Sequence, residues 1–317
     1  MDIFRSVVTR PSSFRSLRSL VFSGNRPFIS NWFWDMINTA PKLTKVATTI
    51  LHNSTVIPYH RLTILMITYT CECEDLLATL AHCTSLQVLG VCSLDADYDP
   101  EIEVNVASLR RLSFNTHGID IHIFLEHLTL PRLETLEIAV WSDDESGSVS
   151  LEPFADLLRR SECPLNELSL DIPYFYTSDA GLRALFELCP GISRLELSVW
   201  EEKKDRDTFI YGLLNALRPS PDKSKGMLAP RLAEIRVVED NSSVDQATAT
   251  ALLDIIEARN GRRIDESIDI WDFKLEFGEL QECPVEVLMA FNARMNGLVD
   301  KGVQCTIEWA KGTFSEC

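Results

Sequence analysis

The hexapeptide Leu133-Glu-Thr-Leu-Glu-Ile138 carries the pattern that decides the fold, with Leu or Ile at its first, fourth and sixth positions. The phrase Leu-x-x-Leu-x-Leu, in which other residues, mostly apolar, replace some leucines, recurs at intervals of 19 to 40 residues. Its nine copies begin at Leu17, Leu43, Leu62, Leu86, Leu109, Leu133, Leu165, Ile192 and Leu232. Because side chains alternate along a strand, positions four and six share one face, and positions three, five and seven share the other. Each copy therefore predicts a short, half-buried strand.

A spacing mostly in the twenties is typical of a leucine-rich repeat. Parallel neighbouring strands need a crossover segment, which is often a helix. The segments between the copies carry apolar residues at helical spacing, as in residues 73–82, 121–128, 151–160 and 248–259. We therefore predict an α/β leucine-rich-repeat solenoid, a horseshoe with a parallel sheet on its concave side and helices on its convex side.

We predict a single leucine-rich-repeat domain over residues 1–317, because stacked repeats bury a continuous core at any length. Residues 14–239 hold about nine repeats. The phrase dissolves after Val238, but residues 268–277 alternate apolar and charged side chains, and a helix near 285–298 and a strand near 303–309 follow. We interpret residues 240–317 as degenerate C-terminal repeats that cap the stack.

The chain carries a net charge of −17, unevenly spread. Residues 1–130 hold 10 basic and 12 acidic side chains, whereas residues 131–317 hold 20 and 35. Such a field repels phosphate backbones, so we expect no nucleic-acid partner. No apolar run reaches the length that crosses a bilayer, and we expect no membrane association and a monomeric chain.

The nine cysteines are an odd number, and the N-terminus lacks the apolar core of a secretory signal. A reducing compartment, cytoplasmic or nuclear, is therefore the expected location. Cys83, Cys163 and Cys189 fall two or three residues before a copy of the phrase, where a small thiol serves as a packing residue.

The sequence contains no Gly-x-Ser-x-Gly elbow, no phosphate-binding Gly-Lys-Ser/Thr loop and no His-Glu-x-x-His motif. The nearest cluster is His117, His122, Glu126 and His127. A spacing of five places two of these histidines about 140° apart on a helix, which makes them a poor pair of metal ligands. We therefore expect no enzymatic activity, no metal and no cofactor.

The outward positions three and five of the strands form the candidate binding face, and Val21, Lys45 and Ala47 are among them. In the early repeats, Ile64, Met66 and Val88 form an apolar patch, whereas the later repeats present charged and hydrogen-bonding side chains. An apolar patch beside a polar field suits a protein or peptide ligand, whose identity the pattern does not reveal.

Trp141 and Trp200 stand just past their strands, where an aromatic side chain either seals the rim or anchors a partner. The predicted binding residues on the face and the rim are Ile64, Met66, Val88, Arg111, Ser113, Glu137, Trp141, Glu167, Arg194, Glu196, Trp200 and Arg236.

Residues 125–138, 157–170 and 188–197 resemble the leucine-rich-repeat part of the large fungal (mushroom-type) F-box-like protein family. The resemblance covers roughly residues 14–265, and the helix predicted at 252–263 fits the last repeat of such proteins. It implies a non-enzymatic protein-binding module, the substrate-recognition part of an F-box-like ubiquitin-ligase receptor.

Members of that family begin with an F-box, which docks on the adaptor subunit of a cullin-based ligase. No Leu-Pro-x-Glu-Ile-type F-box precedes the repeats in this sequence, so we expect no cullin adaptor to bind. The alternative function is that of a free-standing repeat scaffold or receptor outside ubiquitin transfer.

Overall fold

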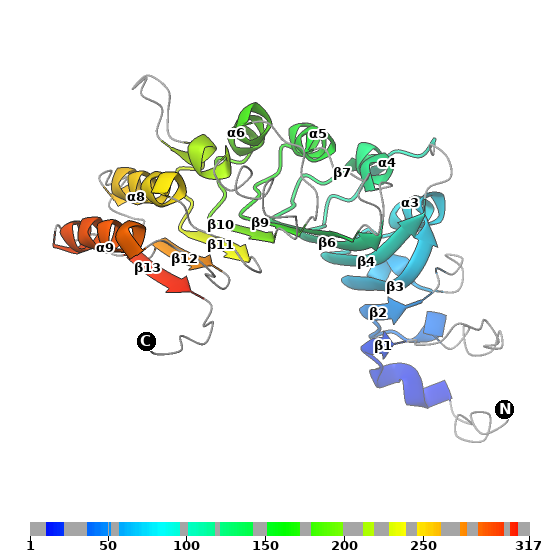
Figure 1. The fold of residues 1–317 in the computed structure, drawn as a ribbon. Coiled ribbons are helices and arrows are strands. Elements are labelled where there is room, and N and C mark those ends of the chain that lie inside the picture. The colour runs from blue at the N-terminus through cyan, green and yellow to red at the C-terminus, as the bar shows by residue number, and fades with distance from the viewer. Residues whose placement is uncertain are drawn as a thin grey trace. The chain divides into compact units, whose positions relative to one another are not determined.

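The computed structural model describes residues 11–21, 37–49, 51, 57–95, 101–117, 121–141, 151–171, 179–198, 212–218, 228–238, 246–260, 273–277, 285–300 and 305–309. The chain forms two compact units: the first comprises Met1–Glu134 and Arg160–Cys163, and the second comprises Thr135–Arg159 and Pro164–Cys317. In each unit, parallel strands alternate with helices (Figure 1), which confirms the predicted α/β fold class. The single-domain interpretation stays a prediction.

The first unit has the strand order β1-β2-β3-β4-β6, with every neighbouring pair parallel, and a separate short parallel ladder pairs β5 with β7. Its elements are the 3-10 helix η1 (Pro11–Ser16), β1 (Ser19–Val21), β2 (Lys45–Thr48), the 3-10 helix η2 (Tyr59–Arg61), β3 (Ile64–Glu72), α3 (Cys73–Leu80), β4 (Val88–Asp95), β5 (Val104–Asn105), β6 (Arg111–His117), α4 (Ile121–Glu126) and β7 (Leu128–Thr129).

The second unit has the strand order β8-β9-β10-β11-β12-β13, again parallel. Helices α6, α8 and α9 lie on one side of these strands (Figure 1). Its elements are β8 (Thr135–Trp141), α5 (Glu152–Ser161, whose last two residues belong to the first unit), β9 (Glu167–Asp171), α6 (Asp179–Leu188), β10 (Arg194–Ser198), β11 (Glu234–Val238), α8 (Gln246–Asn260), β12 (Phe273–Phe277), α9 (Val285–Val299) and β13 (Cys305–Trp309).

All nine copies of the leucine phrase form strands, and each strand begins at the third position of its copy. The helices predicted at 73–82, 121–128, 151–160 and 248–259 correspond to α3, α4, α5 and α8, although Leu128 begins β7 and does not belong to α4. Beyond Val238, β12, α9 and β13 continue the alternation, as the sequence predicted for these elements. The phrase therefore determines where strands start, even where the intervals between copies are irregular.

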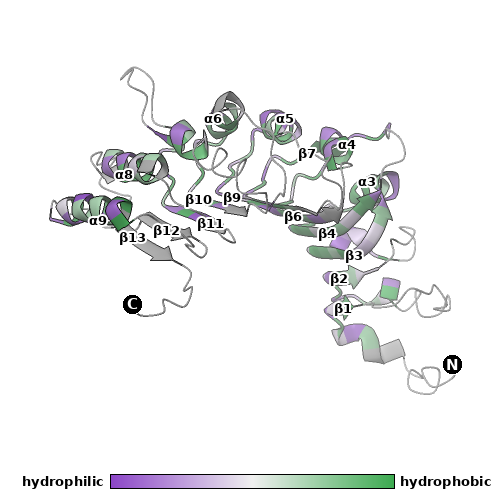
Figure 2. Ribbon diagram, in the orientation of Figure 1, coloured by the Kyte–Doolittle hydropathy of each residue, from purple (hydrophilic) through white to green (hydrophobic). Residues whose placement is uncertain are grey.

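The fourth position of the phrase forms the core of each unit. Side chains at this position are in register on neighbouring strands and at most 2% exposed: Val46, Leu65, Leu89 and Leu112 in the first unit, and Leu136, Leu168, Leu195 and Ile235 in the second. The helices carry both hydrophobic and hydrophilic residues (Figure 2), and the hydrophobic ones complete the core. In the first unit, Phe114 of β6 meets Phe124 of α4 edge to face, with ring centroids 5.2 Å apart.

One carbonyl oxygen links each strand to the next in a recurring way. The carbonyl at position two of a copy accepts hydrogen bonds from the amides at positions two and three of the next copy, at 2.8–3.1 Å. The carbonyls that accept both amides are those of Arg18, Thr44, Thr63 and Gln87 in the first unit, and of Asn166 and Ser193 in the second. We call each of these a rung carbonyl. The repetition of one bonding pattern indicates that the copies are structurally equivalent.

Ion pairs join the helices near the C-terminal end of the second unit. Arg294 of α9 donates hydrogen bonds to Asp254 at 2.7 Å and to Glu257 at 2.8 Å, and Arg218 also pairs with Asp254. Burial raises the pKa of Asp254, but hydrogen bonds from Arg294 and Arg218 outweigh it, so this pKa lies below its usual value. The carboxylate of α8 therefore stays charged and holds α9 in place.

The opposite faces of β6 provide a stability test at two consecutive positions. We expect Leu112→Ala to lower the free energy of unfolding by about 2–5 kcal/mol, because Leu112 is fully buried and the change leaves a cavity. The Ser113 side chain points outward, so the matched variant Ser113→Ala should change the free energy of unfolding by no more than about 0.5 kcal/mol. Urea denaturation followed by circular dichroism measures both. Equal losses in the two variants would contradict the assignment of the faces.

Candidate functional site

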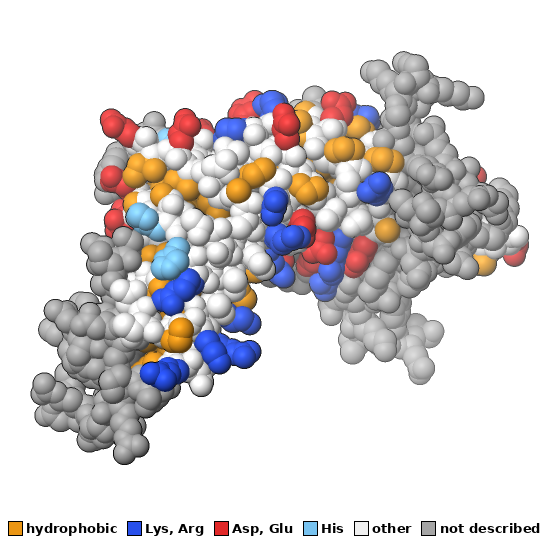
Figure 3. Space-filling model, turned by 180° about the vertical axis from the view of Figure 1, so that it is seen from behind, with side chains coloured by type: hydrophobic (Ala, Val, Ile, Leu, Met, Phe, Trp, Pro, Cys, Tyr) orange, Lys and Arg blue, Asp and Glu red, His pale blue; other side chains and the backbone are white. Residues whose placement is uncertain are grey.

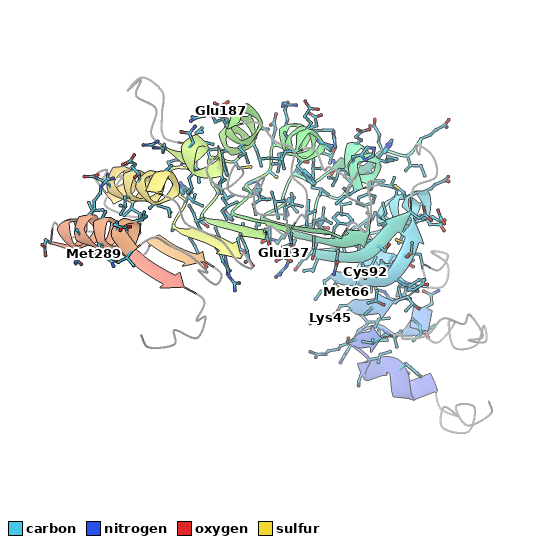
Figure 4. The ribbon with its side chains drawn as sticks, in the orientation of Figure 1. Lys45, Met66, Cys92, Glu137, Glu187 and Met289 are labelled. Atoms are coloured by element: carbon cyan, nitrogen blue, oxygen red, sulfur yellow. The ribbon has the colours of Figure 1, made fainter. Side chains whose placement is uncertain are left out.

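The outward positions of β1, β2, β3, β4 and β6 form one continuous surface in the first unit. Strand register aligns its members in two rows, Ser19, Lys45, Ile64, Val88 and Arg111 in one, and Val21, Ala47, Met66, Gly90 and Ser113 in the other. We call this surface the N-terminal face. Lys45 and Met66 point away from α3, as does Cys92 of β4 (Figure 4).

The middle of the N-terminal face is apolar and accessible. Val21 is 70% exposed and Met66 is 37% exposed, whereas Ile64 and Val88 are half-buried. The Met66 side chain lies over Gly90, because a Cβ placed on that glycine would stand only 2.6 Å from the Met66 sulfur. An unbranched thioether over a bare backbone adapts easily to a partner surface. This geometry suits non-polar contact with a ligand.

The outward positions of the second unit form a different, charged surface. Its members are Thr135, Glu137, Glu167, Ser169, Arg194, Glu196, Glu234 and Arg236, which we call the C-terminal face. Arg194 forms an ion pair with Glu234 at 3.4 Å. Arg236 forms another with Glu196 at 3.3 Å. These pairs join neighbouring strands, so much of the charge on this face is neutralised locally.

The structure brings most of the predicted binding residues together within each unit. Ile64, Met66, Val88, Arg111 and Ser113 lie on the N-terminal face, and Glu137, Glu167, Arg194, Glu196 and Arg236 lie on the C-terminal face. The prediction that Trp141 stands just past its strand was wrong, because Trp141 is the last residue of β8. The Trp141 side chain and the whole of Trp200 lie outside the described residues. Binding by these residues stays a prediction.

Two exposed side chains near the N-terminal face were missed by the sequence analysis. Tyr69 is 55% exposed because the register of β3 shifts between Ile67 and Thr70, which interrupts the alternation of faces. Cys92 occupies the seventh position of its copy and is also exposed. Counting the seventh positions would have found Cys92, but no signal in the sequence marks the bulge.

Among the described residues, no group of three or more His, Cys, Asp or Glu side chains is placed to hold a metal ion. Burial raises the pKa of Cys83 to about 12. Burial, together with nearby Cys73, Asp75 and Glu72, also raises the pKa of Cys71 to about 12. Both thiols therefore stay protonated and unreactive at neutral pH.

None of the helices within the described ranges combines the length and the apolar character needed to cross a membrane. No protein-family model matches the chain. A comparison with curated proteins gives no significant match. The resemblance to fungal F-box-like proteins therefore remains a hypothesis that depends on the quoted stretches of sequence.

We expect iodoacetamide at pH 8 to alkylate Cys92 much faster than Cys83 in the folded protein. With a pKa of about 12, roughly one Cys83 in ten thousand is a thiolate at pH 8, and the thiolate is the reactive form. Tandem mass spectrometry locates the modified cysteines, and urea-unfolded protein, in which both should react, is the control. Equal rates in the folded protein would show that the Cys83 region is open.

Proposed function

We propose that the protein is a leucine-rich-repeat solenoid that binds another protein or a peptide and catalyses no reaction. The repeated rung carbonyls are the observation that carries this proposal. They support a stack of equivalent repeats, and in such a stack the outward positions of all the strands line one extended surface. On this proposal the sheet lies on the concave side and the helices on the convex side.

The chemistry of the outward positions favours a polypeptide ligand. Protein interfaces combine an apolar centre with polar and charged surroundings, and they are enriched in Met and Arg. The N-terminal face supplies Met66 among other apolar side chains, and the C-terminal face supplies charged residues already held in place by ion pairs. Charged side chains that neighbouring strands hold in position lose little conformational entropy on binding.

A role in ubiquitin transfer is the more specific form of this proposal. It depends on the resemblance of residues 125–138, 157–170 and 188–197 to fungal F-box-like repeats. In that role, the outward faces select the substrate that is to be ubiquitinated. We propose it as the cellular context of the same binding activity.

Reversing one charge on the C-terminal face should weaken partner capture. We expect Glu137→Arg to reduce the recovery of bound proteins about tenfold or more, because a reversed charge at an interface repels the partner group that faced it. The matched control is Glu187→Arg, at an exposed position of α6 in the same unit (Figure 4), and it should leave recovery unchanged. Quantitative mass spectrometry of affinity-purified complexes provides the measurement.

Both variants must first show the circular dichroism and melting temperature of the wild-type protein. Equal recovery with Glu137→Arg and Glu187→Arg, or no saturable partner of the wild-type protein, would contradict the proposed function. Co-purification of a cullin adaptor would support the role in ubiquitin transfer. Specific partners without an adaptor would favour a scaffold outside it.

A further inference from the structure

Basic side chains gather near the N-terminus, although the whole chain carries a net charge of −17. Residues 1–71 contain eight basic and two acidic side chains. In the described part of that stretch every charged side chain is a lysine or an arginine. These residues are Arg15, Arg18, Lys42, Lys45 and Arg61. Figure 3 shows Lys and Arg side chains grouped around hydrophobic ones at this end of the first unit. A positive region in an otherwise acidic protein favours an acidic partner.

Two exposed cations border the apolar part of the N-terminal face. Strand register places Ile64 beside Lys45 on one side and beside Val88 on the other. Val88 is in turn aligned with Arg111. Lys45 and Arg111 are both exposed, and Met66 lies in the adjacent row. The face therefore offers an apolar strip between two positive charges.

Lys45 differs from the arginines of the C-terminal face in how its charge is compensated. On the C-terminal face, Arg194 and Arg236 each have a carboxylate partner on a neighbouring strand. Within the described part of the chain, the Lys45 side chain forms no salt bridge or hydrogen bond. Its register neighbours, Ser19 and Ile64, carry no charge that could neutralise it. The Lys45 ammonium is therefore available to a ligand.

We infer that the N-terminal face binds an acidic peptide segment with apolar side chains between its carboxylates. This inference depends on the proposed protein-binding function and specifies the partner's chemistry. In the complex, carboxylates of the segment face Lys45 and Arg111, and an apolar side chain packs on Met66 and Ile64. Nucleic acid is the weaker choice, because a phosphate backbone gains nothing from this apolar strip and is repelled by the net charge of the chain.

The strand spacing sets the pattern that the segment should carry. Lys45 and Arg111 are separated by three strand spacings, or about 14 Å. An extended peptide covers this distance in about four residues. The expected pattern is therefore an acidic residue, three positions with at least one large apolar side chain, and a second acidic residue.

A random 12-residue peptide library, displayed on phage and selected on the 317-residue chain, tests the inference. We expect enrichment of peptides with the acidic–apolar–acidic pattern. Synthetic copies, measured by fluorescence anisotropy, should bind about tenfold or more weakly to Met66→Asp. The matched control is Met289→Asp, since Met289 is 67% exposed on α9, and it should change the affinity less than about twofold.

Charge reversal separates direct contact from a general electrostatic effect. Lys45→Glu should weaken the same peptides about tenfold or more, and Lys42→Glu, with the same charge change off the N-terminal face, should weaken them less. Bound peptide should also protect Cys92 from iodoacetamide. Equal losses for Lys45→Glu and Lys42→Glu would overturn direct contact at Lys45.

Three results would overturn the inference, and they are distinguishable from one another. Enriched peptides that respond to Glu137→Arg but not to Met66→Asp would move binding to the C-terminal face and leave the proposed function standing. Failure to enrich any peptide that responds to changes on either face would contradict both. Tighter, Lys45-dependent binding of a fluorescein-labelled single-stranded DNA than of any acidic peptide would identify a nucleic-acid surface instead.

Discussion

The rung carbonyl is the constraint on which the rest of the structure depends. Each one accepts the amides at positions two and three of the next copy, so each strand starts at a fixed place relative to its neighbour. That fixed start aligns the fourth positions into a buried row, because side chains alternate along a strand. It also aligns the third and fifth positions into outward rows. Core and candidate surface are therefore two consequences of one hydrogen-bonding pattern.

The same alignment explains why the two faces differ. Each outward side chain lies beside the equivalent positions of the neighbouring strands, so the residues aligned in a row determine the local chemistry of the face. Apolar residues align on β2, β3 and β4, whereas opposite charges align between β9, β10 and β11. The N-terminal face thus presents an accessible apolar strip, whereas the C-terminal face presents paired charges. The backbone arrangement of the strands is the same in both.

The phrase was sufficient to predict the parallel strands, the buried rows and most of the helices. The spacing of apolar residues within each copy specifies these elements locally, because the side chain at position four lies on the face of the sheet that is buried. The ion pair of Arg236 with Glu196 was not predicted, because 40 residues separate the two and only the strand register brings them together. The bulge that exposes Tyr69 was also not predicted, because the phrase carries no signal for it. The same holds for the division into two units, since the copy that begins at Leu133 keeps the usual pattern across residue 134.

Cross-linking across neighbouring strands tests the alignment most directly. Glu167 and Arg194 are register partners on β9 and β10, where the strand spacing suits a disulfide. The double variant Glu167→Cys/Arg194→Cys should form that disulfide on mild oxidation, as detected by mass spectrometry of the linked peptides. The offset variant Glu167→Cys/Glu196→Cys should form little. Preferential cross-linking of the offset pair, or none in either, would contradict the strand alignment described above.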